Sequence, residues 1–405
     1  MREGWRKVRV SDVAQVIGGG TPKTFHGPYW DGDIPWITPK DLSDRPALYT
    51  AEGSRSITEA GVKGSGAQWL PAGTVLLSTR APIGYVTIAA RPLTTNQGFK
   101  SLVLADGQLP EYWYYLLSGS TEYLRSRAPG STFPELSKRA VEALEFALPP
   151  VQEQRRIVDL MSHVDGLVAS AVRALDALRR AREAALASQV SIVSDGGLPL
   201  ASMVRITDCE HKTAPTAGEH EVVAGHVVGT PAIRDGRLIH AEARPVNAST
   251  FAKWTSRRLP QEGDVVLTRE APVGQAALIR EEDGPLCLGQ RTVLLSPDER
   301  CDPAFLLAVL MSPAYQEWMR VASVSQTVNR INVKRLGQMP VPAVPIDEQR
   351  AIGLQLRRML EAEDRGREEI GQLRTLRSAL LATLLTAAHE IPSSYDEFIR
   401  DEGAA

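Results

Sequence analysis

Cysteine is scarce in this sequence, which has only Cys209, Cys287 and Cys301 among 405 residues. Their number is odd and none belongs to a CxxC pair, so the sequence predicts neither a disulfide framework nor a zinc site. We expect the seven histidines not to cluster with the cysteines, and we expect no bound metal. Unpaired cysteines of this kind are typical of a reducing cytoplasm.

Long hydrophobic runs are also missing. No stretch approaches the roughly 18 apolar residues that a membrane helix needs, and residues 1–10 are charged rather than apolar. We therefore expect no signal peptide and no membrane span, and a cytoplasmic protein.

Charge of one sign is not in excess, because the formal net charge is -2. A protein that coats DNA without sequence preference would be strongly basic, so that class is disfavoured while local basic patches remain possible. The length allows two or three domains of ordinary globular composition.

The common catalytic signatures are absent as well. The sequence has no GxxxxGK[ST] loop, no GxSxG elbow and no Asn/Asp-Pro-Pro-aromatic loop. His220 and His226 are six residues apart, whereas a zinc protease helix places its two histidines four apart. The sequence thus predicts a binding protein without catalytic residues or a cofactor of its own.

What the sequence does contain is an internal repeat with a period near 190 residues. GTVLLSTRAPIG at 73–84 returns as GDVVLTREAPVG at 263–274, and PVQEQR at 150–155 returns as PIDEQR at 345–350. Short β-rich runs follow the first motif in each copy, and we expect strands at 74–78, 85–88, 265–268 and 275–279.

Each copy ends in a long helical segment that prolines introduce. Three-four spacing predicts a coiled-coil seam in the first helix: Leu160, Val164, Leu167, Ala171, Ala174, Leu178, Ala181 and Ala185. In the second helix, we expect Glu363 and Gly366 to weaken the seam locally. We expect the first helix to end near residues 195–197, where Asp-Gly-Gly is a helix-stop signal.

With these features, the sequence resembles the DNA specificity subunit of type I restriction-modification systems over nearly its whole length. The resemblance rests on the doubled domain-plus-helix layout, on the two PxxEQR helix starts, and on the openings of the two copies at 5–8, 19–23, 34–42 and 206–213. It implies an α+β fold with a pseudo-two-fold repeat, in which two target-recognition domains are separated by two antiparallel spacer helices. The expected parts are recognition domain 1 at 1–148, spacer helix 1 at 149–195, recognition domain 2 at 196–343, spacer helix 2 at 344–389 and a tail at 390–405.

The resemblance further implies a non-catalytic subunit that reads a bipartite, asymmetric site in double-stranded DNA. Two methyltransferase subunits would dock on the helices and bind S-adenosylmethionine, and a restriction subunit, if present, would use ATP and Mg²⁺. A helix of about 40 residues spans roughly 60 Å, and half-sites on one face of DNA lie roughly 34 to 36 Å apart. The paired helices would therefore set the spacing.

Base readout needs donors and acceptors such as those of Arg, Asn and Gln. We expect DNA contacts from residues of these types, and from lysines, that lie in turn regions. The candidates are Lys40, Arg80, Asn96, Gln97, Lys100, Lys212, Arg269, Gln290, Arg291 and Asn329. Gln97 and Gln290 have a structural alternative, the orientation of a strand. The helix and partner-binding candidates are Glu153, Gln154, Arg155, Leu167, Leu178, Glu348, Gln349, Arg350, Leu373 and Leu380. Two other functions stay open: a self-contained duplicated DNA methyltransferase or nuclease, and a coiled-coil scaffold that binds only protein.

Overall fold

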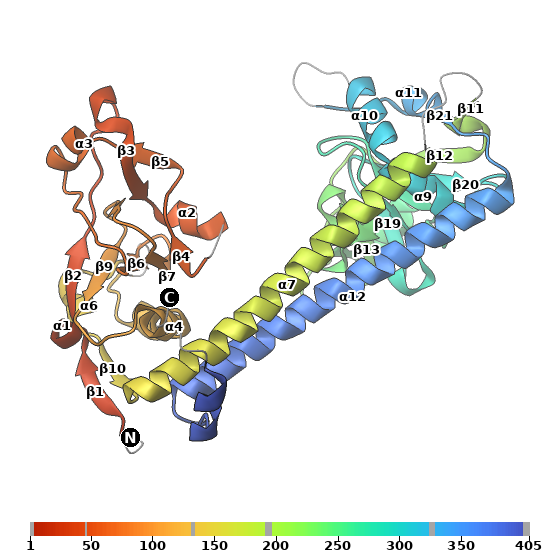
Figure 1. Cartoon of the computed structure of the whole chain (residues 1–405). Coiled ribbons are helices and arrows are strands. Elements are labelled where there is room, and N and C mark those ends of the chain that lie inside the picture. The colour runs from red at the N-terminus through yellow and green to blue at the C-terminus, as the bar shows by residue number, and fades with distance from the viewer. Residues whose placement is uncertain (1–3, 45–46, 131–133, 191–196, 324–328, 400–405) are drawn as a thin grey trace. The chain divides into compact units, whose positions relative to one another are not determined.

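The computed structural model describes most of the chain, namely residues 4–44, 47–130, 134–190, 197–323 and 329–399. The chain divides into two compact units, unit 1 with residues 1–169 and 371–405, and unit 2 with residues 170–370. Two long helices, α7 (Val151–Gln189) and α12 (Ile346–Leu385), contribute one part to each unit (Figure 1). Each unit therefore combines a β-rich part with parts of two helices.

The main sheet of unit 1 has five strands in the order β2-β9-β6-β7-β4. All five residues of β6 are buried, as expected for a strand that is covered on both faces. The sheet is antiparallel except for β4, which pairs in parallel with β7. Its strands are β2 (Ala14–Gly18), β4 (Tyr49–Thr50), β6 (Val75–Thr79), β7 (Ile83–Ala89) and β9 (Lys100–Leu104).

A second sheet of unit 1 has the order β5-β3-β8, with β3 antiparallel to β5 and parallel to β8. The rings of Trp30 and Trp36 pack edge to face beside it, with centroids 5.1 Å apart. The elements here are β3 (Trp30–Ile37), β5 (Arg55–Ile57), β8 (Thr94–Thr95), α2 (Pro39–Asp44), α3 (Glu59–Lys63) and the 3-10 turn η1 (Gly27–Tyr29).

In unit 1, helix α4 packs between the main sheet and the two long helices. Tyr112 and Trp113 of α4 are fully buried and share one apolar core with Met161 of α7 and Leu384 of α12. The remaining elements are β1 (Arg6–Arg9), α1 (Val10–Val13), α4 (Pro110–Gly119), α5 (Thr121–Ser126), α6 (Lys138–Glu142) and β10 (Glu145–Leu148), which pairs with β1.

Unit 2 repeats this topology. Its main sheet has the order β12-β20-β17-β18, and its second sheet has the order β16-β13-β19, again with one antiparallel and one parallel pairing. The strands are β11 (Leu198–Pro199), β12 (Val204–Asp208), β13 (Gly225–Val228), β16 (Arg244–Val246), β17 (Val265–Thr268), β18 (Ala276–Leu278), β19 (Leu286–Leu288), β20 (Thr292–Pro297) and β21 (Pro340–Val341).

The helices of unit 2 follow the same order as those of unit 1. They are α8 (Ala248–Trp254), α9 (Pro303–Met311), α10 (Pro313–Ala322) and α11 (Val333–Gly337), with 3-10 turns η2 (Leu200–Ser202), η3 (Thr230–Ala232), η4 (His240–Glu242) and η5 (Glu281–Asp283). Where unit 1 adds β4 to its main sheet, unit 2 adds a hairpin of β14 (Ile233–Arg234) and β15 (Arg237–Leu238), whose Gly236 bridges Ala277 in parallel.

The repeated motif at 73–84 and 263–274 has a structural cause. Gly73 and Gly84 have φ angles of 82° and 101°, and their counterparts Gly263 and Gly274 have 85° and 90°, which favour glycine. Both Ala-Pro bonds of the motif are cis. The fold class and the strands expected around these motifs are confirmed, with ends that shift by one to a few residues.

The two long helices are antiparallel. In unit 1 the first turns of α7 share a core with the last turns of α12, and in unit 2 Leu186 near the end of α7 shares a core with Ile352 and Leu356 near the start of α12. Helix α7 ends at Gln189, and the helix-stop signal expected from residue 195 lies partly outside the described residues. Among the described helices, none has the length and apolar character needed to cross a bilayer.

The seam predicted for α7 is only partly right. Val164 is buried as predicted, but Leu167 and Leu178 are 59% and 39% exposed, and the other buried positions are Ile157, Met161, Leu175, Arg182 and Leu186. The sequence carries two neighbouring stripes with three-four spacing, and three-four spacing alone does not tell which one the partner helix covers.

Glu363 in α12 also departs from expectation. Its side chain is fully buried and forms ion pairs with Arg182 of α7 and Arg237 of β15. The polar interruption is thus an interhelix ion pair rather than an unfilled position in the seam.

Candidate nucleic-acid interface

In unit 1, most DNA-contact candidates lie at one end of the main sheet. Gly18 at the end of β2 pairs with Lys100 at the start of β9, and the amide of Thr79 at the end of β6 donates to the Gly98 carbonyl, 2.8 Å away. Arg80 and the turn at 96–98 are therefore brought together by strand ends. Lys40 is exposed in the first turn of α2, whose Pro39 lies against Gly98.

The backbone of this sheet end is closely packed. A Cβ on Gly19 would lie 2.0 Å from the Asn96 carbonyl oxygen, so only glycine fits beside this turn. The Asn96 side chain accepts a hydrogen bond from the Gly98 amide at 2.8 Å, and Thr21 donates to the Gln97 side-chain carbonyl. Asn96 and Gln97 thus help to shape the turn, in line with the structural alternative for Gln97.

The cations of this sheet end are held by one acid. Glu135 lies 3.7 Å from Arg80 and 3.7 Å from Lys100, and these three side chains are 42%, 38% and 14% exposed, respectively. Ion pairs of this length and exposure are weak, so Arg80 can be released to a phosphate or a base edge at small cost.

Unit 2 builds the same sheet end from different side chains. Thr213 donates to the Gln290 side chain at 3.2 Å, just as Thr21 donates to Gln97. Arg291 is half-exposed and lies 3.5 Å from Glu270, while Lys212 and Asn329 are exposed. The unit 2 candidates other than Arg269 therefore present polar groups at this end.

Arg269, which the sequence predicts to contact DNA, is buried. Its side chain is 2% exposed, with Nη2 3.1 Å from Nδ1 of His211 and Nε 3.3 Å from Oδ1 of Asp208. Because the guanidinium is enclosed by these neighbours, Arg269 supports the loop after β12 and does not reach a DNA surface in this conformation.

The same loop corrects the expectation that histidines and cysteines lie apart. Ligand atoms of Asp208, Cys209 and His211 all lie within 4.8 Å of one another. However, the Arg269 cation contacts both Asp208 and His211, which opposes a metal ion there. Burial and the Asp208 charge raise the pKa of the Cys209 thiol, so its thiolate is disfavoured.

The two sheet ends also carry one ion pair with reversed polarity. In unit 1, Arg80 follows β6 and pairs with Glu135, whose neighbour Leu136 donates its amide to the Thr79 carbonyl. In unit 2, Glu270 follows β17 and lies 3.2 Å from Arg330, whose neighbour Ile331 donates its amide to the Arg269 carbonyl. The sheet ends share a backbone and differ in the placement of charge.

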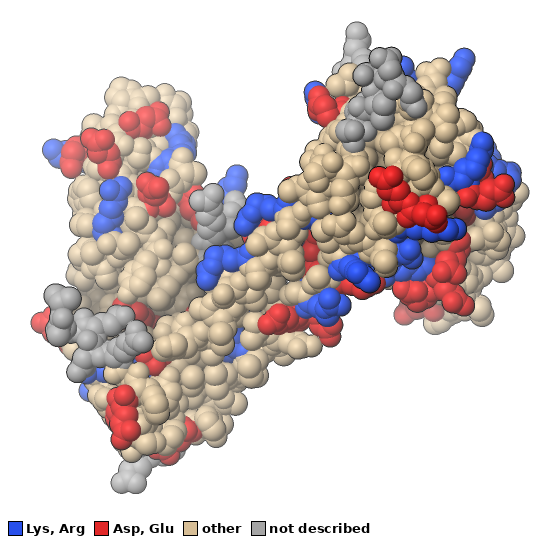
Figure 2. All heavy atoms as spheres, turned by 45° about the vertical axis from the view of Figure 1, so that its right-hand side comes forward, with Lys and Arg blue, Asp and Glu red and all other residues tan. Residues whose placement is uncertain are grey.

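The sequence reading missed the roles of Glu135, Glu270 and Arg330 here. Aligning the two repeats places Glu270 opposite Arg80, which is a signal for the reversal. On the face drawn in Figure 2, acidic and basic side chains are interspersed, in agreement with the near-neutral net charge.

The helix-start motif divides into structural and exposed members. Gln349 is 3% exposed, donates to the carbonyls of Arg300 and Val344 at 3.0 and 2.8 Å, and accepts from the Asp302 amide at 2.9 Å. Gln154 is 2% exposed and donates to the Pro149 carbonyl at 2.9 Å. Both glutamines tie a helix start to its own unit, which favours their spacer-helix role over contact with a partner.

The other members of the motif can face a partner. Arg155, Glu348 and Arg350 are exposed and Glu153 is half-buried. Among the candidate leucines, Leu167 and Leu178 are exposed, while Leu373 and Leu380 are half-buried. Leu354 and Leu376 add further exposed apolar area on α12, at 45% and 57% exposure. A contiguous exposed apolar patch marks a protein-binding surface, whereas single exposed leucines are common on any protein, so these leucines are candidates only.

Comparison with known proteins shows which proteins this chain resembles. The family model for the type I restriction modification DNA specificity domain matches residues 2–176. The type I restriction enzyme MjaIX specificity subunit of Methanocaldococcus jannaschii is 46% identical over 166 residues, which are 40% of this chain and 38% of that protein. The MjaVIII specificity subunit of the same organism is 19% identical over 408 residues, 95% of this chain and 92% of that protein.

The fold has a solved counterpart. A chain from a structure on the complex assembly and conformational transition of the type I R-M system superposes with a TM-score of 0.60 at 20% identity, over 95% of this chain and 98% of that one. Residues 2–176 thus match the type I restriction modification DNA specificity domain, and the chain spans about two fifths of the length of the first relatives it matches.

Proposed function

We propose that the chain is the DNA-recognition subunit of a type I restriction-modification complex, in which each unit reads one half of a bipartite DNA site. The observation that carries this proposal is the repetition of one sheet topology with different polar side chains at the corresponding sheet end. Equal backbones with unequal side chains favour an asymmetric site, because each unit presents its own donors and acceptors.

Tethering gives the two readers joint selectivity. Once one unit is bound, binding of the other is intramolecular, so two modest affinities combine into a high one. The antiparallel helices α7 and α12, of 39 and 40 residues, would then set the spacing between the half-sites. Their exposed leucines would dock two methyltransferase subunits.

The chemistry would belong to those partners. The methyltransferase subunits would bind S-adenosylmethionine, and a restriction subunit, where one joins, would bind ATP and Mg²⁺. The chain itself would contribute recognition and geometry and no catalytic group.

The test is to purify the chain with a co-expressed methyltransferase subunit and to footprint the complex on DNA. We expect two protected blocks separated by an unprotected stretch, with binding that weakens as salt rises. One contiguous block, or no salt-dependent binding, would contradict the proposal and favour a protein-only scaffold. Methyl transfer from labelled S-adenosylmethionine by the chain alone would favour a self-contained methyltransferase.

A further inference from the structure

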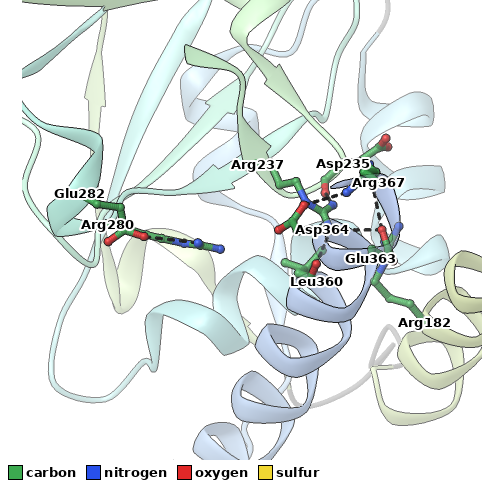
Figure 3. A network of polar contacts seen from close by, with 9 residues as sticks. All are labelled: Arg182, Asp235, Arg237, Arg280, Glu282, Leu360, Glu363, Asp364 and Arg367. Atoms are coloured by element: carbon green, nitrogen blue, oxygen red, sulfur yellow. Dashed lines mark hydrogen bonds and ion pairs between the residues drawn. The ribbon is translucent and has the colours of Figure 1, made fainter. Parts of the chain in front are cut away.

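A buried ion-pair network joins three segments of unit 2 (Figure 3). Its centre is Glu363 of α12, which is fully buried. The carboxylate accepts from Arg182 Nε of α7 at 2.7 Å, from Arg237 Nη2 of β15 at 3.3 Å and from Arg367 Nη2 of α12 at 3.2 Å.

Arg237 is the contribution of the β-rich part, and its guanidinium is fully engaged. Nε donates to Asp364 at 2.6 Å, Nη2 to the Leu360 carbonyl at 2.7 Å and Nη1 to the Asp235 carbonyl at 2.7 Å. One side chain thus binds the backbone and two carboxylates of α12 while it fixes the turn of its own hairpin.

The hairpin itself presses closely on its surroundings. Asp235 and Gly236 both have positive φ, at 51° and 80°, as in the tight turn of a hairpin with a two-residue loop. A Cβ on Gly236 would lie 2.7 Å from Sδ of Met311 in α9 and 3.3 Å from Leu360 in α12. The turn therefore packs closely between α9 and α12, with no room for a side chain at position 236.

The energetics of buried charge make this joint specific. A buried ion pair adds little net stability compared with apolar packing, but leaving one partner unpaired in a buried site is strongly unfavourable. Sliding of the hairpin along α12 by one turn would separate Arg237 from Asp364 and from the Leu360 carbonyl. An apolar joint would carry no such penalty, so the network selects one register.

We propose that Arg237 is a positioning residue that locks the second recognition domain onto the helix pair in a single register, and that this lock selects the number of base pairs between the half-sites. The inference rests on the proposed function and deepens it. It predicts that loosening the lock leaves the contacts to bases intact and widens the range of spacings that the complex accepts.

The experiment uses the chain in complex with its methyltransferase subunits and a DNA library in which the distance between half-sites varies. The test variant is Arg237→Met. The matched control is Arg280→Met, because Arg237 and Arg280 line the same pocket of unit 2, while the Arg280 side chain is 41% exposed and pairs with nearby Glu282, at 3.4 Å. We expect wild type and Arg280→Met to select one spacing, and Arg237→Met to lose roughly tenfold in discrimination between adjacent spacings, equivalent to about 1.4 kcal/mol.

Two outcomes overturn the inference and leave the proposed function intact, and a third overturns both. If Arg237→Met folds and keeps the wild-type spacing preference, the lock is refuted while the recognition function stands. If Arg237→Met does not fold, Asp364→Ala replaces it, since Asp364 is 45% exposed and its loss removes one of the two carboxylates that Arg237 binds. The bonds to Leu360 and Glu363 remain, so we expect a smaller loss of discrimination, and an unchanged preference in folded Asp364→Ala also refutes the lock. If wild type selects no bipartite site, the proposed function fails and the lock fails with it.

Discussion

Each unit places an ion pair between α7 and α12, and in each a side chain from the β-rich part touches it, but the two pairs differ in burial. In unit 1, Arg377 pairs with Asp165, which also accepts from the Tyr115 hydroxyl at 2.9 Å. Asp165 is 32% exposed, whereas Glu363 in unit 2 is 0% exposed. The comparison teaches that one pseudo-symmetric joint can be built around a partly exposed ion pair or around a fully buried one.

The largest difference should follow from neutralising the central acid of each pair. Glu363→Gln removes the charge that Arg182 and Arg237 share in a buried site, so we expect the free energy of unfolding to fall by about 3 to 5 kcal/mol. Asp165→Asn acts in a more exposed site and should cost about 1 kcal/mol or less. Urea denaturation measures both, with exposed Glu183→Gln as the control. Equal losses for the two variants would break the comparison.

A smaller difference in stability should follow from removing the glutamine at each helix start. Gln349 makes three hydrogen bonds to its unit, whereas Gln154 donates one and its Oε1 has no hydrogen-bond partner among the described residues. Gln349→Leu removes the side-chain partner of two carbonyls and one amide, all in part-buried hydrogen bonds, and we expect a loss of about 2 to 3 kcal/mol. Gln154→Leu should cost about 1 kcal/mol or less. Thermal unfolding of the two variants tests this order, and a larger loss for Gln154→Leu would contradict it.

The reversed ion pair at the sheet ends gives a smaller effect on DNA binding. Arg80 lies at the end where β2, β6 and β9 meet the turn at 96–98, while Arg91 follows β7 at the opposite end of the same sheet. If Arg80 contacts a phosphate, Arg80→Ala should reduce the slope of log affinity against log salt by about 1. Arg91→Ala is the matched control and should leave the slope unchanged. An equal change in both variants would place the interface elsewhere.

The repeat explains how much of this could be predicted from the sequence. The strands after Gly73 and Gly263 and the helix starts at PxxEQR follow from local patterns, because glycine, proline and alternation constrain the backbone locally. The α+β class is implied by the family resemblance that these motifs carry. The register of the α7 seam does not follow from a local pattern, because three-four spacing fits both Leu160–Val164–Leu167 and Ile157–Met161–Val164, and only the packed partner helix decides between them.

Side-chain roles at the candidate site were harder still. Arg80 and Arg269 are both arginines at the end of a β6-type strand, yet the first is 38% exposed and the second 2% exposed. Burial of Arg269 depends on Asp208 and His211 from another strand end, a long-range contact that no local pattern encodes.

The smallest expected effect concerns the C-terminal segment, which covers the start of α7 in unit 1. Arg156 donates two hydrogen bonds of 2.6 Å to Asp396 in the 3-10 turn η6 (Ser393–Phe398), and Tyr395 donates to Asp159 at 2.8 Å. The bond from Arg156 holds the pKa of Asp396 below its ordinary 3.8. A carboxyl with a depressed folded-state pKa stabilises fully above its unfolded pKa, and the contribution is lost as pH falls through the folded pKa.

The turn should therefore be held at pH 5 and loosen as the pH falls below 3.8, which pepsin can report because Phe398 is 71% exposed in this turn. We expect cleavage beside Phe398 to accelerate in wild type as the pH falls, relative to cleavage of a peptide with the same local sequence. Asp396→Asn should be cleaved rapidly at pH 5 already, because the amide cannot form the ion pair. Equal rates for wild type and Asp396→Asn at pH 5 would mean that Tyr395 and the buried Ile391 hold the segment without help from Asp396.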